Sequence, residues 1–226
     1  MLRVLDWDLP GLGRNLAAVR QAGPAGEWTN IGWPGFVGCV TGLAPGRFAA
    51  AINQPPMPFS GLGRVGDWVC SRPAVWRSRA LPPLHLLRQV FDTATDWQEA
   101  VAMLTHTPLS TRAFFVVVGV ETDQACAIER LPDAAKVSYG SVAMANHWRS
   151  MPERGLPRGE DSETRQADMA AFVGGTDDPW SMEWLKAPIL NRTTRVSAVL
   201  CPATGRIKVA GGEADGRATE WLETVG

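Results

Sequence analysis

The most regular pattern of hydrophobic and polar residues lies between positions 33 and 56. Two apolar runs, 36–41 and 48–52, flank a Gly-Leu-Ala-Pro-Gly segment, which is typical of a β-hairpin with a longer loop. Because neither run carries a charge, we expect this hairpin in the middle of a sheet that is covered on both sides. The second run stops at Asn53, so this polar side chain is expected at a strand end, where sites are often built.

Short apolar runs elsewhere predict further strands, at 2–7, 16–19, 28–31, 113–120, 126–130, 137–141, 142–145, 194–201 and 207–210. The intervening stretch 57–79 is rich in Gly, Pro, Arg and Trp. Irregular segments of that length in a compact domain tend to be functional lids or mobile loops. We therefore expect a long loop there.

Three helices are expected from helical spacing and from capping residues. The first begins at Leu81-Pro82-Pro83, because proline is tolerated in a first turn, and its stripe is Leu84, Leu87, Val90 and Phe91. The second begins at Thr95, where Thr-Asp-Trp-Gln has the form of a capping box. The third is capped by Ser162, and Arg165, Met169, Phe172 and Val173 share one of its faces.

Paired helices between groups of antiparallel-looking strands predict an α+β fold, either as two sheets covered by helices or as a simpler α+β arrangement. A chain of 226 residues with 45% hydrophobic and 20% charged residues can bury a large core, so one domain over 1–226 is expected.

Charge and cysteine usage narrow the range of partners. The formal charge is −1, which gives no electrostatic reason to expect nucleic acid or an anionic membrane, so a small molecule is the expected partner. We find no span for a bilayer and no signal peptide, which predicts a soluble, cytoplasmic protein. The four cysteines and three histidines lack metal-ligand spacing, so no metal or other cofactor is expected, and Cys39 and Cys126 predict buried free thiols. Homo-oligomerisation stays open.

Five short motifs follow one another along nearly the whole chain. They are Arg3-Val-Leu-Asp6-Trp7, Trp33-Pro-Gly-Phe-Val-Gly38, Ile52-Asn53, Ala145-Asn146-His147-Trp148 and Asp161-Ser-Glu-Thr-Arg165. This ordered set resembles the acid ceramidase and N-acylethanolamine amidase group of N-terminal-nucleophile hydrolases, which is similar to penicillin V acylases and bile salt hydrolases. The resemblance implies an αββα sandwich and an amidase that cleaves the linear carbon–nitrogen bond of an N-acyl amide.

In that group the nucleophile is a cysteine at the start of the mature chain, and its own α-amine is the base. An α-amine titrates near pH ~8, so it can take the thiol proton near neutrality. The resemblance places this cysteine on a preceding strand, roughly 10–15 residues upstream of Met1. A start codon assigned too late, a chain that lacks its first strand or a true loss of catalysis would each explain its absence. The retained downstream motifs favour the first.

The resemblance also implies roles for six residues. Arg3 would favour the thiolate, Asp6 would hold the α-amine, and Arg165 would brace the site. The side-chain amide of Asn146 and the backbone N–H of Asn53 would hold the oxyanion. Trp7 is placed with the substrate, in a pocket that other tryptophans could also wall.

The spacing between Arg3 and Asp6 constrains the first strand. Three residues apart, they would point to opposite faces of a regular strand. If both serve one pocket, the strand must bulge or end near Leu5 or Asp6. For Arg165, burial in a helix face requires a partner, which Asp6 or Asp161 would supply.

Each of these residues also has a purely structural interpretation. Arg3 and Asp6 could form a surface ion pair, both asparagines could be turn residues, Arg165 could extend past the core to water, and the tryptophans could belong to the core. At the level of function, an acyltransferase with the same site and an inactive member that binds an acyl or amide ligand, or a protein, through 57–79 stay open. A Cys39–His protease is disfavoured because nothing at mid-hairpin would activate the thiol.

Overall fold

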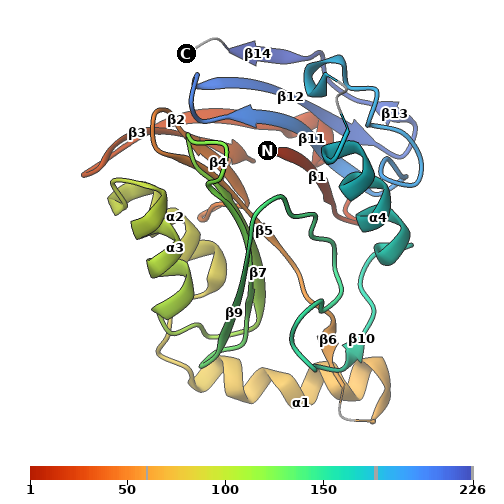
Figure 1. Cartoon of the computed structure of the whole chain (residues 1–226). Helices are drawn as coiled ribbons and strands as arrows, with labels where there is room; N and C mark the ends of the chain where they lie inside the picture. The colour runs from red at the N-terminus through yellow and green to blue at the C-terminus, as the bar shows by residue number, and fades with distance from the viewer. Residues whose placement is uncertain (60, 176–177, 225–226) are drawn as a thin grey trace.

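The chain forms two antiparallel sheets that stack face to face, with helices on their outer faces (Figure 1). This computed structural model describes residues 1–59, 61–175 and 178–224. The layers are α2 and α3, a seven-stranded sheet, a five-stranded sheet, and α4. The arrangement is the αββα sandwich that the resemblance implied, within the predicted α+β class.

The seven-stranded sheet has the order β2-β3-β4-β5-β7-β8-β9. Its strands are β2 (Ala17–Gly23), β3 (Gly26–Gly32), β4 (Thr41–Ala44), β5 (Phe48–Asn53), β7 (Ala113–Val118), β8 (Ala125–Arg130) and β9 (Ala135–Tyr139). The predicted hairpin pairs β4 with β5 at the centre of the sheet. Alternate residues of β5 point to opposite layers: Phe48, Ala50 and Ile52 face the helices, whereas Ala49 faces the second sheet.

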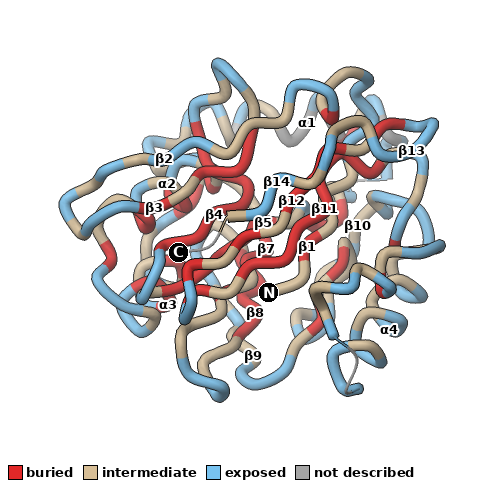
Figure 2. Tube along the Cα trace, turned by 90° about the horizontal axis from the view of Figure 1, so that it is seen from above, coloured by how far each residue is buried: buried red, intermediate tan, exposed pale blue. Residues whose placement is uncertain are grey.

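The second sheet has the order β1-β11-β12-β13, and β14 also pairs with β12. Its strands are β1 (Leu2–Asp6), β11 (Thr194–Cys201), β12 (Arg206–Glu213), β13 (Gly216–Arg217) and β14 (Leu222–Thr224). Val196, Ala198 and Leu200 of β11 pack against the first sheet. In Figure 2 the central strands of both sheets consist largely of buried residues.

Four α-helices lie outside these sheets in the described part of the chain. They are α1 (Gly63–Arg77), α2 (Pro83–Thr93), α3 (Trp97–His106) and α4 (Ser162–Val173), with short 3₁₀ turns at Gly13–Asn15 and Pro179–Ser181. The two-stranded pair β6 (Met57–Pro58) and β10 (Gly155–Leu156) joins the segments before α1 and α4. Helix α4 packs Met169 and Phe172 against the outer face of the five-stranded sheet.

The first strand of the hairpin was predicted wrongly. Residues 36–40 of the predicted run are irregular, and β4 begins only at Thr41. Two backbone groups of the irregular run bond to residues outside it. Asn30 donates to the Gly38 carbonyl at 3.0 Å, and Cys39 N–H donates to Leu84 O at 3.0 Å. Within β4, Gly42 packs closely against Phe91, because a Cβ at this position would lie 2.8 Å from the Phe91 ring.

The predicted loop 57–79 was also wrong, since it contains the helix α1. Several of its described apolar side chains are strongly exposed: Val65 is 77% exposed and Trp76 is 76% exposed. Exposed apolar positions of this kind weaken the amphipathic periodicity by which a helix is identified from sequence. Pro73, inside the helix, is a further breaker signal.

The strand predicted at 142–145 does not form. Side chains, rather than a neighbouring strand, satisfy this backbone. Asn53 Nδ2 donates to the carbonyls of Met144 and Ala145, at 3.0 and 3.4 Å, and Arg149 donates to Ala143 O at 3.2 Å. The segment is thus extended by tertiary contacts that no local pattern encodes.

Both predicted helix caps are displaced by one residue. Helix α3 is capped by Asp96, whose carboxylate accepts from Glu99 N–H, while the Glu99 carboxylate accepts from Thr95 N–H; each distance is 2.8 Å. Helix α4 follows Asp161, a left-handed residue at φ 46°, and not Ser162. The hydroxyl of Ser162 is engaged elsewhere.

Candidate active site

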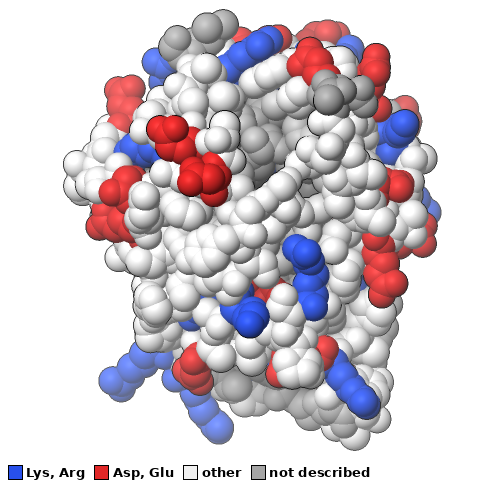
Figure 3. Space-filling model, viewed as in Figure 1, with Lys and Arg blue, Asp and Glu red and all other residues white. Residues whose placement is uncertain are grey.

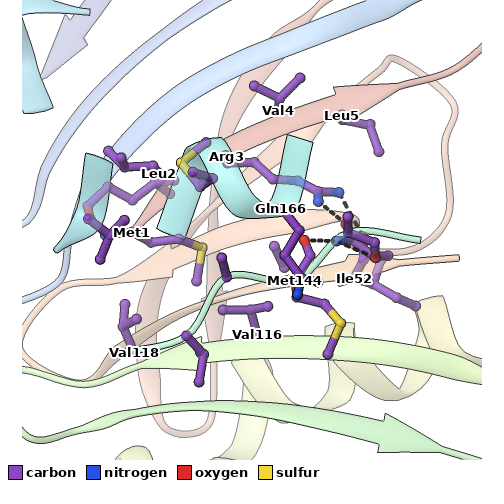
Figure 4. A pocket seen from close by; sticks show the side chains of 18 of the residues that line it. Met1, Leu2, Arg3, Val4, Leu5, Ile52, Val116, Val118, Met144 and Gln166 are labelled. Atoms are coloured by element: carbon purple, nitrogen blue, oxygen red, sulfur yellow. Dashed lines mark hydrogen bonds between the residues drawn. The ribbon is translucent and has the colours of Figure 1, made fainter. Parts of the chain in front are cut away.

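A cavity of about 1260 Å³ lies along β1, between the two sheets and α4. Within the described part of the chain, β1 pairs with β11 on one edge only, and its residues line the cavity. Figure 4 shows Arg3 reaching across towards Ile52, with Met144 and Gln166 nearby and Val116 and Val118 of β7 below. One end is therefore polar and the rest largely apolar.

Five of the six candidate residues, Arg3, Asp6, Asn53, Asn146 and Arg165, lie at the polar end of this cavity, and Trp7 lies on its wall. They come from β1, β5, α4 and the segment after β9. The structure thus brings together residues up to 162 positions apart, whereas their chemical roles stay predictions.

Arg3 and Asp6 both line the cavity, and the ladder between β1 and β11 is irregular beside Asp6. The register with β11 runs from Leu5 opposite Val196 to Asp6 opposite Thr194, so one residue of β11 is skipped. This irregularity lies where the spacing of the two side chains predicted a bulge or a strand end.

Arg3 is 4% exposed and is held by three hydrogen bonds. Its guanidinium donates to Thr41 Oγ1 at 3.2 Å, to Ile52 O at 2.7 Å and to Asn53 Oδ1. Burial lowers the pKa of Arg3 to about 10, although the nearby Asp6 carboxylate opposes this shift, so the group is charged at neutral pH. Arg3 thereby places a fixed positive charge beside β1.

Asn53 connects Arg3 to the segment that carries Asn146. Its side-chain oxygen accepts from Arg3, and its nitrogen donates to Met144 O and Ala145 O. The side chain thus has a structural task that the sequence did not reveal. The predicted oxyanion role of its backbone N–H stays a prediction.

Asp6 and Arg165 form a largely buried ion pair in which each side chain is 11% exposed. Thr194 Oγ1 donates to the other carboxylate oxygen of Asp6 at 2.8 Å. Of the two partners considered for Arg165, the structure selects Asp6, while Asp161 accepts only the backbone N–H of Arg165, through its carbonyl. The Nε–H of Arg165 is buried without a hydrogen-bond partner in the structure.

Asn146 is fixed at both its backbone and its side chain. Its backbone N–H donates to Ser162 Oγ at 2.8 Å, and its Nδ2 donates to Gln54 O at 2.8 Å. Because the amide nitrogen carries two hydrogens, one remains for another acceptor.

Trp7 is 36% exposed and packs edge-on against Trp33, with ring centroids 5.7 Å apart. Trp33 donates in turn to Leu12 O at 2.7 Å. Trp7 lines the cavity, whereas Trp33 is packed against the buried core. This packing suits a substrate contact as well as the core role considered from sequence.

Three residues at the site were missed by sequence reasoning. Ser162 contacts the backbone of Asn146; Gly159 stands at φ +74° between Asn146 and Arg165; and Gln166 lines the cavity with Oε1 buried and unpartnered. Ser162 lies within the last motif, and Gly159 precedes it. Gln166 had no sequence signal, because a glutamine next to a helical arginine is ordinary.

The described cysteines differ in burial. Cys39 and Cys126 are free and fully buried, as predicted, whereas Cys201 is half-buried and lines the cavity. The side chain of Cys70 lies outside the described residues. Across the described ranges, no group of three or more His, Cys, Asp or Glu residues is arranged to hold a metal ion.

Positive and negative side chains are both present on the molecular surface that Figure 3 shows. On the face in Figure 3, Lys and Arg are interspersed with Asp and Glu, with no large basic area. No helix among residues 1–59, 61–175 and 178–224 has both the length and the apolar character needed to cross a bilayer.

Comparisons with known proteins agree with the ordered motifs. No family model matches the chain. The acid ceramidase of Homo sapiens is 29% identical over 115 residues, which are 50% of this chain and 28% of that protein. For the acid ceramidase of Bos taurus the figures are 28% identity over 97 residues, 42% of this chain and 23% of that protein. The chain therefore spans about a quarter of the length of these curated relatives.

Among solved structures, the Caenorhabditis elegans N-acylethanolamine-hydrolyzing acid amidase ortholog is similar with a TM-score of 0.69 and 17% identity. The alignment covers 99% of this chain and 93% of that chain. The fold is thus shared over nearly the whole length, and the sequence resemblance to acid ceramidases is confirmed.

Proposed function

We propose that this acid ceramidase-like chain is the catalytic part of an N-terminal-nucleophile cysteine amidase that hydrolyses the linear carbon–nitrogen bond of an N-acyl amide. The observation that carries the proposal is the convergence of Arg3, Asn53, Asn146 and the Asp6–Arg165 pair on one cavity along β1. Such a set offers charge and hydrogen-bond donors to a developing oxyanion while an apolar wall continues from it.

The nucleophile is proposed to be a cysteine upstream of Met1, on a strand that pairs with the cavity-facing edge of β1. The support is that β1 has a ladder partner, β11, on one edge only within the described residues. An antiparallel strand on the other edge would bring its side chains within reach of Arg3 and Asp6.

Arg3 and Asp6 would then act on opposite parts of that cysteine. The buried guanidinium of Arg3 favours the thiolate over the thiol, because it supplies positive charge in a site of low dielectric constant. The Asp6 carboxylate accepts a hydrogen bond from the cysteine α-amine while Arg165 and Thr194 hold it in place. Since the α-amine titrates near pH ~8, it serves as the base near neutrality.

The reaction would proceed through an acyl-cysteine. The sulfur attacks the amide carbonyl carbon, the carbonyl electron pair moves to oxygen, and the thiol proton passes to the α-amine. The second N–H of Asn146 donates to the resulting oxyanion; loss of such a donor typically costs about 3 kcal/mol of barrier. The α-amine gives its proton to the leaving nitrogen as the carbon–nitrogen bond breaks, and water then releases the acid and restores the thiol.

The apolar part of the cavity is proposed to hold the acyl group. It is lined by Val116, Val118, Val199 and Phe172, with Trp7 beside the polar end. Hydrophobic burial favours a hydrocarbon chain there. The relatives' names refer to ceramide and N-acylethanolamine substrates, which share an amide-linked acyl group.

The test is to read the upstream genomic sequence and to express the protein with its native preceding residues. We expect an in-frame cysteine before a strand-like run, release of amine from a fluorogenic N-acyl amide, and an acyl adduct on that cysteine by mass spectrometry. A variant with alanine at that cysteine should lose turnover, whereas Cys201→Ser should keep it. Turnover that survives the alanine variant, or an upstream region with no in-frame cysteine, would refute the proposal.

A further inference from the structure

Ser162 contacts the candidate site without belonging to the proposed chemistry. It is the first residue of α4, one position after the N-cap, where serine is a favoured residue. Here the capping position belongs to Asp161, which makes no side-chain cap bond. The hydroxyl of Ser162 points instead to the neighbouring segment.

Two groups of that segment converge on the Ser162 hydroxyl. The backbone N–H of Asn146 donates to Oγ at 2.8 Å, and Nδ1 of His147 lies 2.9 Å from the same oxygen. Because Oγ already accepts from Asn146, its proton is free to be donated to Nδ1 when that nitrogen is unprotonated. One hydroxyl therefore bonds to two successive residues.

The same helical turn carries Arg165. Residues three apart are neighbours on a helix surface, so Ser162 and Arg165 lie on the same side of α4, and Arg165 lines the cavity. Arg165 bonds to Asp6 on β1, while Ser162 bonds to Asn146. A Cβ at Gly159 would lie 3.4 Å from Asn146 Oδ1 and 3.5 Å from Arg165 Nη1, so both groups border the same small space.

The other side of the segment is held from β5, through Asn53 to Met144 O and through Gln54 O to the Asn146 amide. Ser162 thus holds the segment from α4, while Asn53 and Gln54, at and just after the end of β5, hold it from the seven-stranded sheet. With no ladder around 142–146, these side-chain bonds fix the direction in which Asn146 projects.

We propose that Ser162 is a positioning residue: its hydroxyl fixes the backbone of Asn146 against α4 and so aligns the Asn146 amide with the group that Arg165 and Asp6 face, while His147 orients the hydroxyl. This inference rests on the proposed function for its catalytic consequence. We call the Ser162–Asn146 backbone contact the clamp. The clamp is a property of the fold and can be measured without turnover.

The experiment compares Ser162→Ala, Ser162→Thr and the control Thr93→Ala, which removes a hydroxyl with a 2.8 Å backbone contact from α2. In the protein with its native upstream residues, Ser162→Ala should lower kcat about tenfold or more with KM changed less than about twofold, because misplacement of a catalytic group costs rate. Ser162→Thr keeps the hydroxyl and should restore most of the rate, and Thr93→Ala should match the parent.

Hydrogen exchange of peptides covering 142–150 provides the readout that needs no activity. Ser162→Ala should speed exchange there and Ser162→Thr should not, even if no amide is hydrolysed. Unchanged exchange in Ser162→Ala overturns the clamp. Faster exchange with an unchanged kcat, or a rate loss that threonine does not restore, overturns the positioning role. Absence of turnover in the parent refutes the proposed function alone.

Discussion

The guanidinium of Arg165 bonds to the carboxylate of Asp6 although 159 positions separate them in the sequence. The pair joins α4 to β1 at the edge of the cavity, and both side chains are 11% exposed. In such a setting the attraction is weakly screened by solvent, while removal of one partner leaves the other charge poorly solvated.

Arg165→Ala should therefore lower the free energy of unfolding by about 3 kcal/mol, because Asp6 would keep only Thr194 as a partner. Urea denaturation measures this loss. The control is Arg217→Ala, since Arg217 pairs with Glu220 at 3.5 Å with the two side chains 47% and 94% exposed. Loss of that pair should cost less than about 1 kcal/mol. Equal losses for the two variants would contradict a buried role for the Asp6–Arg165 pair.

Arg3→Lys should destabilise the protein although it keeps the charge. A lysine ammonium cannot reproduce the planar fork that contacts Thr41, Ile52 and Asn53, so buried acceptors lose their donor at about 1–3 kcal/mol each. Because Asn53 would lose its anchor, hydrogen exchange at 142–146 should also speed up. Arg20→Lys, at an exposed position of β2, should change neither stability nor exchange.

Gly159→Ala separates backbone strain from interference with the site. Gly159 has φ +74° and Gly46 has φ +71°, so alanine at either should cost about 1–2 kcal/mol. A Cβ at Gly46 meets nothing within 4 Å, whereas one at Gly159 contacts Asn146 and Arg165. Both variants should lose similar stability by thermal unfolding, but only Gly159→Ala should lose most of its kcat. A similar loss of kcat in Gly46→Ala would show that strain alone explains the effect.

Elements whose signals are local could be predicted from the sequence. Helix α2 begins after Pro82 and buries Leu87, Val90 and Phe91, because an apolar stripe and a proline start are both local. The odd spacing of Arg3 and Asp6 predicted an irregularity or a strand end near Leu5 and Asp6, and the ladder with β11 is irregular there.

Elements whose polar groups bond to residues distant in sequence could not be predicted in this way. The run 36–40 is apolar enough for a strand, yet Asn30 and Leu84 take its backbone bonds. In the same way, Ser162 was assigned as a cap because only its neighbours in sequence were visible, whereas its hydroxyl serves Asn146. The motifs located the candidate site; the contacts that hold it are tertiary.

The three described cysteines should differ sharply in reactivity. Burial raises the pKa of the Cys126 thiol to about 12 and that of Cys39 further still, although a backbone hydrogen bond opposes the shift at each. At Cys201 burial also disfavours the thiolate, but the Thr204 hydroxyl, the backbone N–H groups of Thr204 and Ala203 and the positive N-terminus together outweigh it and lower the pKa. Thiolate, the reactive form, therefore persists at Cys201 to lower pH than in an ordinary cysteine.

With iodoacetamide at neutral pH, Cys201 should be alkylated well before Cys39 or Cys126, as peptide mass spectrometry can measure. As the pH falls, the alkylation rate at Cys201 should decline over a lower pH range than the rate at a cysteine in the unfolded chain, because the folded pKa is the lower one. In urea the pH dependence of the three sites should converge, since unfolding removes both burial and the Thr204 contacts. Alkylation of Cys39 in the folded protein as fast as Cys201 would contradict this assignment, and Cys201→Ser supplies the background against which an upstream nucleophilic cysteine can be labelled.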